Sequence, residues 1–169
     1  MTTHQSSTAS QSLMDRKPTT PNASVPHLTE PIDDEFEVRI SSGAAGDGAL
    51  ERDSQGEWVG RLRRLSAAKL RSWGLESLSG DATLLVSELL TNALRYGEGR
   101  KIDFRLVITD QLLVITVNDG SPRRPELSVV GTDRTTGRGL FIVAAFADDW
   151  GVSPDGTTTW CTLRTRGAR

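Results

Sequence analysis

Histidine and cysteine are almost absent from this 169-residue chain, and where they occur excludes several classes of enzyme. The sequence has one cysteine, Cys161, and two histidines, His4 and His27. A single cysteine forms neither an internal disulfide nor a thiolate cluster, which fits a reducing cytoplasm. Because no histidine follows residue 27, the rest of the chain holds no Ser-His-Asp triad, no histidine metal site and no phospho-accepting histidine. Cys161 lies in an alternating run, so we expect a buried strand residue rather than a nucleophile.

Long apolar runs and an excess of charge of one sign are also missing. The longest apolar runs, such as FIVAAFA, are only a few residues long, so we expect no membrane-spanning helix. The polar N-terminus lacks the apolar region of a secretory signal. Lys and Arg number 20 against 22 for Asp and Glu, a net charge of -2. Nonspecific binding to nucleic acid or a membrane surface requires a surplus of cations, so we expect a cytoplasmic protein with neither partner.

The composition changes near residue 34. Residues 1–34 contain both histidines, both methionines and four of the seven prolines, among many serines and threonines. Such a segment buries too little apolar surface to offset the entropy lost on ordering. We therefore expect a disordered tail over residues 1–34 and one folded domain over residues 35–169, which is electrically neutral.

Hydrophobic periodicity predicts the order of elements in the folded part. In chain order we expect a strand over 36–40, a loop over 43–56, helices over 58–73 and 81–97, strands over 101–109 and 112–119, an irregular segment over 120–137, a helix over 139–150 and a strand over 156–165. The two central strands are joined by Asp110-Gln111, which is typical of an antiparallel hairpin. This order predicts an α+β fold, a two-layer sandwich in which one mostly antiparallel, mixed sheet is covered by helices on one face.

The two long helices show different patterns. In the first, apolar residues recur at helical spacing, opposite a set of arginines that is either a solvated face or an interaction surface. That expected apolar face comprises Trp58, Leu62, Leu65, Leu70 and Trp73. In the second, Asp81 is a good N-cap, and Gly97 ends the helix. Its expected apolar stripe comprises Leu85, Leu89, Ala93 and Tyr96, with Val86 and Leu90 beside it.

Polar residues in three places indicate a site. Glu88 and Asn92 project from one face of the second helix, one turn apart. Taken alone, they are most simply a solvated polar edge. Asn118-Asp119-Gly120 ends a strand, however, and residues 137–139 (Gly-Arg-Gly) open a helix. Carboxylate and amide oxygens suit Mg²⁺, and a glycine-flanked helix start exposes N–H groups to phosphate. The combination indicates a nucleotide site.

Four motifs together resemble one family. The segments ELLTNALRYG, VNDGSP, GRGLFIV and DGTTTW look like the N box, the two glycine boxes and the closing threonine strand of the GHKL (Bergerat) ATP-binding fold. Within that fold, shared by gyrase, heat-shock chaperone ATPases, histidine kinases and MutL, the chain resembles the small bacterial anti-sigma-factor serine kinases. The resemblance covers roughly residues 58–165.

The resemblance implies roles for the residues at the phosphate end. Asn92 would coordinate the Mg²⁺ that bridges the phosphates, and Glu88 would act as general base or water-positioning carboxylate. Gly137, Arg138 and Gly139 would hold the polyphosphate at a helix start. Phosphoryl transfer depends mainly on positioning and charge neutralisation, so it requires no histidine or reactive cysteine. The sequence contains no GxxxxGK[ST] motif, which excludes the Walker-type alternative.

At the base end, the resemblance implies that Asp119 accepts a hydrogen bond from the adenine amino group. Gly120 would let the backbone approach the ring, and Thr158 would support the adenine pocket. The segment between the glycine boxes would be a mobile lid. Its arginines reach phosphates or are solvated, and the sequence does not separate these alternatives; they are Arg123, Arg124 and Arg134.

The resemblance implies an anti-sigma factor that uses ATP and Mg²⁺, binds a sigma factor and phosphorylates a serine on a STAS-domain antagonist. Related proteins commonly dimerise through this fold, which allows a homodimer. The second glycine box is shorter than the GxGxG of many kinases. An ATP-sensing binding module with negligible turnover is therefore an alternative hypothesis. A detached histidine-kinase catalytic domain is a third, which the Ser121-Pro122 continuation of the first glycine box disfavours.

Overall fold

The computed structural model describes the chain in several stretches: residues 24–26, 28, 31–41, 48–97, 100–122 and 138–165, with the side chains of 48–54 and 138 left out. Most of the predicted tail and nearly all of the predicted lid, with its three arginines, lie outside the described residues. Gly137 lies outside them too.

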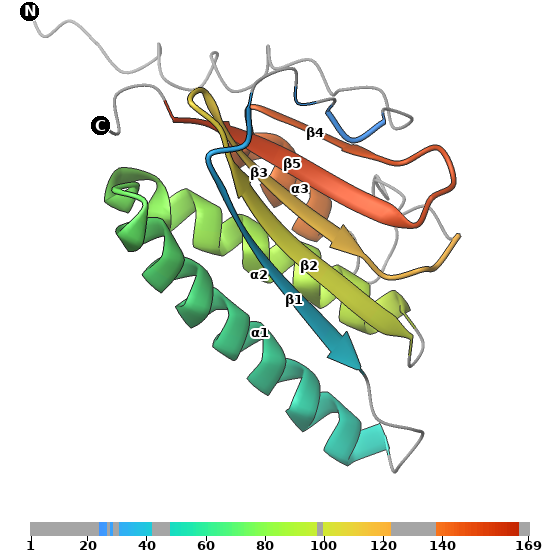
Figure 1. Ribbon diagram of the computed structural model, residues 1–169. Coiled ribbons are helices and arrows are strands. Elements are labelled where there is room, and N and C mark those ends of the chain that lie inside the picture. Colours follow the sequence, from blue (N-terminus) through green and yellow to red (C-terminus); the bar gives the residue numbers. More distant parts are fainter. Residues whose placement is uncertain are drawn as a thin grey trace, which may run out of the picture.

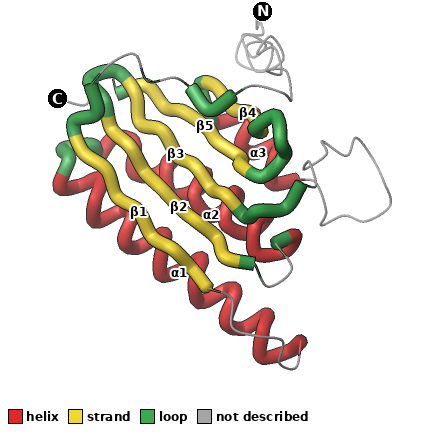
Figure 2. Tube along the Cα trace, turned by 45° about the vertical axis from the view of Figure 1, so that its right-hand side comes forward, coloured by secondary structure: helices red, strands yellow, loops and turns green. Residues whose placement is uncertain are grey.

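The described elements form two layers (Figures 1 and 2). In chain order they are β1 (Asp34–Ser41), α1 (Gly48–Ser72), a 3₁₀ turn (Glu76–Leu78), α2 (Ser79–Tyr96), β2 (Lys101–Ile108), β3 (Leu112–Asn118), α3 (Arg138–Phe146), β4 (Asp149–Val152) and β5 (Thr158–Arg164). The five strands pair in the order β1-β2-β3-β5-β4, and every pair among them is antiparallel. The helices lie against one face of the sheet. This confirms the predicted α+β sandwich with helices on one face, although the sheet is antiparallel throughout the described strands and not mixed.

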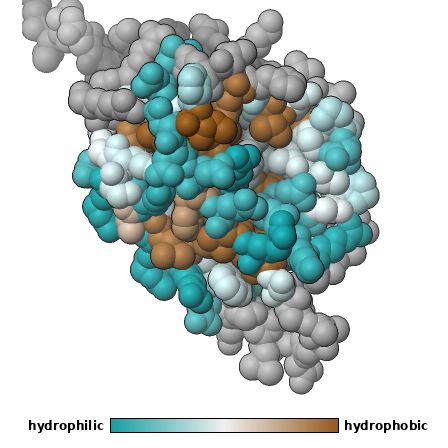
Figure 3. Space-filling view, viewed as in Figure 1, coloured by the Kyte–Doolittle hydropathy of each residue, from teal (hydrophilic) through white to brown (hydrophobic). Residues whose placement is uncertain are grey.

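The core lies between α2 and the alternate residues of the central strands. Ile102, Phe104 and Leu106 of β2 are buried there, as are Leu113 and Ile115 of β3. The intervening residues of β1 and β2 point the other way, and two pairs of them form ion pairs across the strands, Arg39 with Asp103 and Arg105 with Glu35. Figure 3 looks onto the side where the strands lie in front, and hydrophilic side chains predominate over it. The period-2 alternation therefore sets which face of the sheet the helices cover.

Helix α1 is longer than predicted. Residues 48–56, expected as a loop from their Gly, Ser and Asp content, are helical. An isolated glycine such as Gly56 costs a helix only about 1 kcal/mol, and the neighbouring residues sustain the helix. Gln55 also donates a hydrogen bond to the Leu94 carbonyl of α2. The apolar face is only partly as expected, because Leu62 and Leu70 are buried whereas Leu65 is 41% exposed.

Helix α2 starts earlier than predicted, at Ser79, after Leu78 as N-cap. Asp81 is therefore not the cap but lies in the first turn, where its charge still favours the helix dipole. The expected apolar stripe of α2 is buried except for Tyr96, which is half-buried. The buried stripe fixes which face of α2 remains available for polar side chains.

The predicted helix over 139–150 is too long, because its last residues form a strand. Helix α3 ends at Phe146, and Asp149–Val152 pair with β5 as β4. A Cβ on Gly151 would lie 2.7 Å from the Trp160 ring, so the indole packs directly on the β4 backbone. The strand escaped prediction because the apolar run preceding it continued the helical pattern and only four residues belong to β4.

Cys161 lies in β5 and is fully buried, as predicted. Its neighbours in the register are Ile115 on β3 and Trp150 on β4. Burial raises the pKa of its thiol, which keeps it protonated. Among the described residues, no helix has the length and apolarity needed to cross a membrane.

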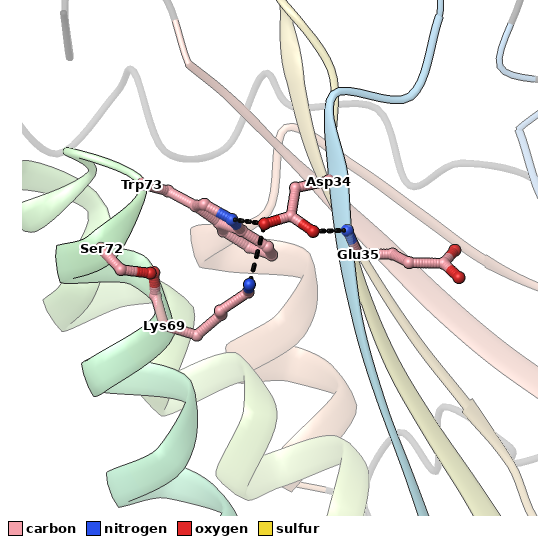
Figure 4. Close-up of polar contacts among 5 residues, drawn as sticks. All are labelled: Asp34, Glu35, Lys69, Ser72 and Trp73. Atoms are coloured by element: carbon pink, nitrogen blue, oxygen red, sulfur yellow. Dashed lines mark hydrogen bonds and ion pairs between the residues drawn. The ribbon is translucent and has the colours of Figure 1, made fainter.

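Strand β1 is fastened to α1 through Asp34 (Figure 4). One carboxylate oxygen of Asp34 accepts hydrogen bonds from Lys69 Nζ and Trp73 Nε1, each at 2.8 Å. The hydrogen bonds from Lys69 and Trp73 lower the pKa of Asp34 to about 2. Strand β1 thus starts one residue before the boundary that composition predicts, and its first side chain orients the edge strand against the helix.

One buried hydroxyl in α1 leads to a stability prediction. Ser66 is fully buried, and within the described part of the chain its Oγ has no hydrogen-bond partner. Desolvating a hydroxyl without a partner costs free energy, so Ser66→Ala is expected to raise the free energy of unfolding by about 1 kcal/mol. Urea denaturation measures this.

The matched control is Ser87→Ala in α2, since the Ser87 hydroxyl donates to the Thr83 carbonyl at 2.8 Å. Both variants gain the same helix propensity, so Ser66→Ala should be the more stabilising. If Ser87→Ala were the more stabilising of the two, the Ser66 hydroxyl would have a hydrogen-bond partner in solution.

Candidate functional site

The side chains of Glu88 and Asn92 lie against the first turn of α3. A Cβ on Gly139 would be 2.8 Å from Glu88 Oε2, and 3.2 and 3.3 Å from Asn92 Nδ2 and Oδ1. Both side chains are only half-buried, so each also has access to solvent. The i, i+4 spacing on α2 therefore places a carboxylate and an amide together at a helix start, as the sequence predicts.

The start of α3, where Glu88 and Asn92 lie, favours an anion and holds a carboxylate with a raised pKa. The first N–H groups of a helix lack intrahelical acceptors, and the helix dipole makes that end favourable for anions. Burial raises the pKa of Glu88, because water is partly excluded from its carboxylate. A carboxylate with a raised pKa is a better proton acceptor near neutral pH than an exposed one. The end of α3 thus offers N–H donors for an anion beside a group that accepts a proton.

The second part of the site is the turn that follows β3. Gly120 has a φ of 63°, in the left-handed region that favours glycine. Its N–H donates to Asn118 Oδ1 at 3.0 Å, and the Ser121 N–H donates to Asp119 Oδ1 at 2.8 Å. Burial raises the pKa of Asp119, while the Ser121 N–H and the nearby charge of Arg100 act in the opposite direction. The turn therefore holds a half-buried carboxylate in a fixed orientation.

Thr158 joins the same turn through Asn118, which the sequence places next to Asp119 in the predicted site without a role of its own. Asn118 Nδ2 donates to Thr158 Oγ1 at 2.8 Å and is 3.4 Å from Thr157 Oγ1. The Asp119 N–H donates to the Thr157 carbonyl at 3.1 Å. Asn118 thus connects the turn to the start of β5. Its position at the end of a strand before Asp-Gly was the available signal, since Asn favours such side-chain turns.

Helix α2 connects the two parts of the site. Gly97, its C-cap, is so close to the turn that a Cβ there would lie 3.6 Å from Asp119 Cβ. Asn92 and Gly97 are about 7.5 Å apart along the helix axis, given a rise of about 1.5 Å per residue. Helix α2 therefore presents two places along its length. Near one, Glu88 and Asn92 lie beside the anion-favouring start of α3; near the other, Gly97 lies beside the hydrogen-bond-accepting Asp119.

The remaining predicted site residues fall at the edge of the described chain. Arg138 begins α3, but its side chain is outside the described set, as is the whole of Gly137. Their predicted contact with phosphate stays a prediction. Glu88, Asn92, Gly139, Asp119, Gly120 and Thr158 are all placed around α2, β3 and the start of β5.

The donor set fits a magnesium ion that is shared with phosphate. Among the described residues, no group of three or more His, Cys, Asp or Glu side chains is arranged to hold a metal. Mg²⁺ usually takes only one or two protein ligands and completes its octahedron with water and phosphate oxygens. The half-buried Asn92 amide beside Glu88 supplies such a limited set, and Asn92 is the residue that would hold the ion.

The contact at Gly139 yields a prediction. In Gly139→Ala the new methyl group would displace the Glu88 carboxylate, the flexible end of a side chain. We therefore expect the free energy of unfolding to change by less than about 1 kcal/mol, while the rate of the phosphoryl transfer that the motif resemblance implies falls at least tenfold because the carboxylate moves.

Gly80→Ala is the matched control, since Gly80 is the second residue of α2 as Gly139 is of α3, and nothing lies within 4 Å of a Cβ there. Steady-state turnover and urea denaturation compare the two variants. Equal turnover in both would contradict the placement of Glu88 against α3.

Comparison with known families gives one match. The model of the histidine kinase-like ATPase domain matches residues 54–163, which include every described element except β1, the start of α1 and the last residue of β5. No curated protein matches the chain.

Proposed function

Since the chain belongs to the histidine kinase-like ATPase domain family, we propose that it binds Mg²⁺-ATP in the site around α2. The proposal assigns Asp119 to the adenine amino group, with Gly120 allowing close approach of the backbone and Thr158 supporting the pocket. The triphosphate lies at the start of α3, along residues 137–139. The observation that carries the proposal is the contact of Glu88 and Asn92 with Gly139.

The proposed activity is phosphoryl transfer from ATP to a serine hydroxyl. The serine oxygen forms a bond to the γ-phosphorus, the bond from that phosphorus to the β–γ bridging oxygen breaks, and ADP leaves. Glu88 accepts the proton of the hydroxyl, and its raised pKa and position beside the α3 N-terminus support that role. A bound Mg²⁺ would neutralise phosphate charge, and Asn92 would hold it.

We further propose that the protein is an anti-sigma factor that acts in the cytoplasm. It binds a sigma factor and phosphorylates a STAS-domain antagonist on serine. The support for this partner assignment is the motif resemblance, in particular the Asp119-Gly120-Ser121-Pro122 spacing.

The test of the kinase proposal is incubation of the purified protein with labelled ATP, magnesium and candidate STAS-domain proteins. Transfer of label to a serine of one partner, lost in Glu88→Ala, supports the kinase. Failure to label any candidate, with ATP binding intact, would eliminate the kinase and leave ATP binding.

A second candidate is an ATP-sensing module without significant turnover. One observation favours it: among the described residues, no hydrogen bond or ion pair orients the Glu88 carboxylate. In this case ATP would change partner affinity only to the extent that it binds two states of the protein differently. ATP-dependent partner binding that persists in Glu88→Gln, without any phosphotransfer, distinguishes it from the kinase.

A further inference from the structure

Arg100 connects the end of α2 to the turn after β3, although no sequence motif includes it. Its backbone N–H donates to the Gly97 carbonyl at 2.9 Å. Its side chain crosses to the turn, where Nη1 donates to the carbonyl oxygen of Gly120. Arg100 Cδ also lies 3.9 Å from the position of a Cβ on Gly120. Arg100 thus contacts both Gly97, at the end of α2, and Gly120, in the turn next to Asp119.

Gly120 consequently has both of its backbone polar groups bound by side chains. Asn118 accepts from its N–H, and Arg100 donates to its carbonyl oxygen. Glycine loses more conformational freedom on folding than any other residue, so a turn built on it depends on such contacts for a fixed geometry. The hydrogen bond from Arg100 is charge-assisted, which makes it stronger than a neutral one.

We infer that Arg100 is a positioning residue for the nucleobase, holding the Asp119-Gly120 turn against the end of α2 so that the Asp119 carboxylate meets the base. The inference rests on the proposed ATP binding. Arg100 acts through the turn and not on phosphate, because its contacts are with Gly97 and Gly120, whereas the α3 start contacts Glu88 and Asn92.

The arrangement also gives Arg100 an electrostatic effect. Its charge lowers the pKa of Asp119, against the larger effect of burial. Within the described stretches, the other groups facing Asp119 are uncharged: Gly97 at the end of α2, the Ser121 N–H, and the Thr157 carbonyl before β5. Asp155, the acid on the β4–β5 turn, accepts hydrogen bonds from Ser153 and Thr157. Removing the Arg100 charge should therefore let Asp119 protonate at higher pH.

The experiment compares ATP with tripolyphosphate, a probe that has the phosphates but no base. Calorimetry on the full-length protein should show about tenfold weaker ATP binding in Arg100→Ala, the equivalent of losing one charge-assisted hydrogen bond. Tripolyphosphate binding should stay unchanged. Arg100→Lys, which keeps the charge, should recover part of the ATP affinity.

The matched control is Lys101→Ala, which removes a cation one residue away whose side chain shows no polar contact among the described residues. The ratio of ATP affinities between wild type and Arg100→Ala, measured across pH, removes the titration of ATP itself. That ratio should grow as the pH falls through the acid range, because Asp119 protonates earlier in the variant. Tripolyphosphate binding measured at each pH separates this effect from acid unfolding of the variant, which would weaken the binding of both ligands.

Equal losses for ATP and tripolyphosphate would overturn the inference, because Arg100 would then act on the phosphates or on the fold. Unchanged ATP affinity in Arg100→Ala would overturn it as well. A wild-type protein that binds no ATP would instead overturn the proposed function, so the two failures are distinguishable.

Discussion

Glu88→Gln is expected to reduce the rate of phosphoryl transfer by at least about 100-fold, the usual contribution of a positioned general base. Glutamine has nearly the same size, so it fits against Gly139 as the carboxylate does. ATP affinity should change by less than about threefold, because the base acts on the attacking group rather than on bound nucleotide. Single-turnover transfer and calorimetric ATP binding measure the two effects separately.

The pH dependence gives a second readout of the same variant. Burial raises the pKa of Glu88, so wild-type turnover should fall as the pH drops through that raised value. The residual turnover of Glu88→Gln should lack this acid limb. Glu76→Gln, at an exposed carboxylate in the 3₁₀ turn before α2, is the control and should leave both rate and pH profile unchanged. If Glu88→Gln transferred phosphate at the wild-type rate, Glu88 would not be the general base.

Asn92→Ala is expected to eliminate the magnesium-dependent part of ATP binding. The amide lies half-buried next to Glu88 and the α3 start, and no larger cluster of ligands exists among the described residues to replace it. Because Mg²⁺ takes so few protein ligands, loss of one should weaken Mg²⁺-ATP binding at least about tenfold. ATP binding measured in EDTA should change much less.

Asn92→Asp is the matched variant, because it retains an oxygen of the same reach and adds a charge that magnesium favours. It should keep the difference between binding in magnesium and in EDTA. If Asn92→Ala retains the full magnesium effect, another residue holds the ion and the assignment of Asn92 is wrong.

Sequence patterns predicted which candidate residues lie together better than they predicted some of the elements that carry them. The apolar stripe on α2 determines which way Glu88 and Asn92 point, but the pair became a candidate only together with the Asp-Gly strand end and the glycine-flanked helix start. The Asp119-Gly120 turn was identifiable because Gly permits a positive φ where a strand ends. Both patterns lie within short stretches of sequence, so they can be recognised without knowledge of the tertiary structure.

The misplaced elements depend on contacts between distant segments. Strand β4 exists because its four residues pair with β5 and because Gly151 accepts the Trp160 ring, and neither partner is visible in the local pattern. Leu65 fits the periodicity of α1, but the helix turns it outward. Arg100 was not identified for the same reason, since its contact with Gly120 depends on how α2 and β3 meet.

The most direct test of the central claim, that α2, the turn after β3 and the start of α3 form one Mg²⁺-ATP site, is thermal unfolding of the wild-type protein titrated with ATP, once in magnesium and once in EDTA. A ligand that binds only the folded state stabilises it by about 2.7 kcal/mol at a hundredfold excess over its Kd. That corresponds to a rise in Tm of about 8 °C for a domain of this size. The account predicts such a rise with ATP and magnesium, and a smaller one in EDTA. An unchanged Tm at millimolar ATP and magnesium would contradict it.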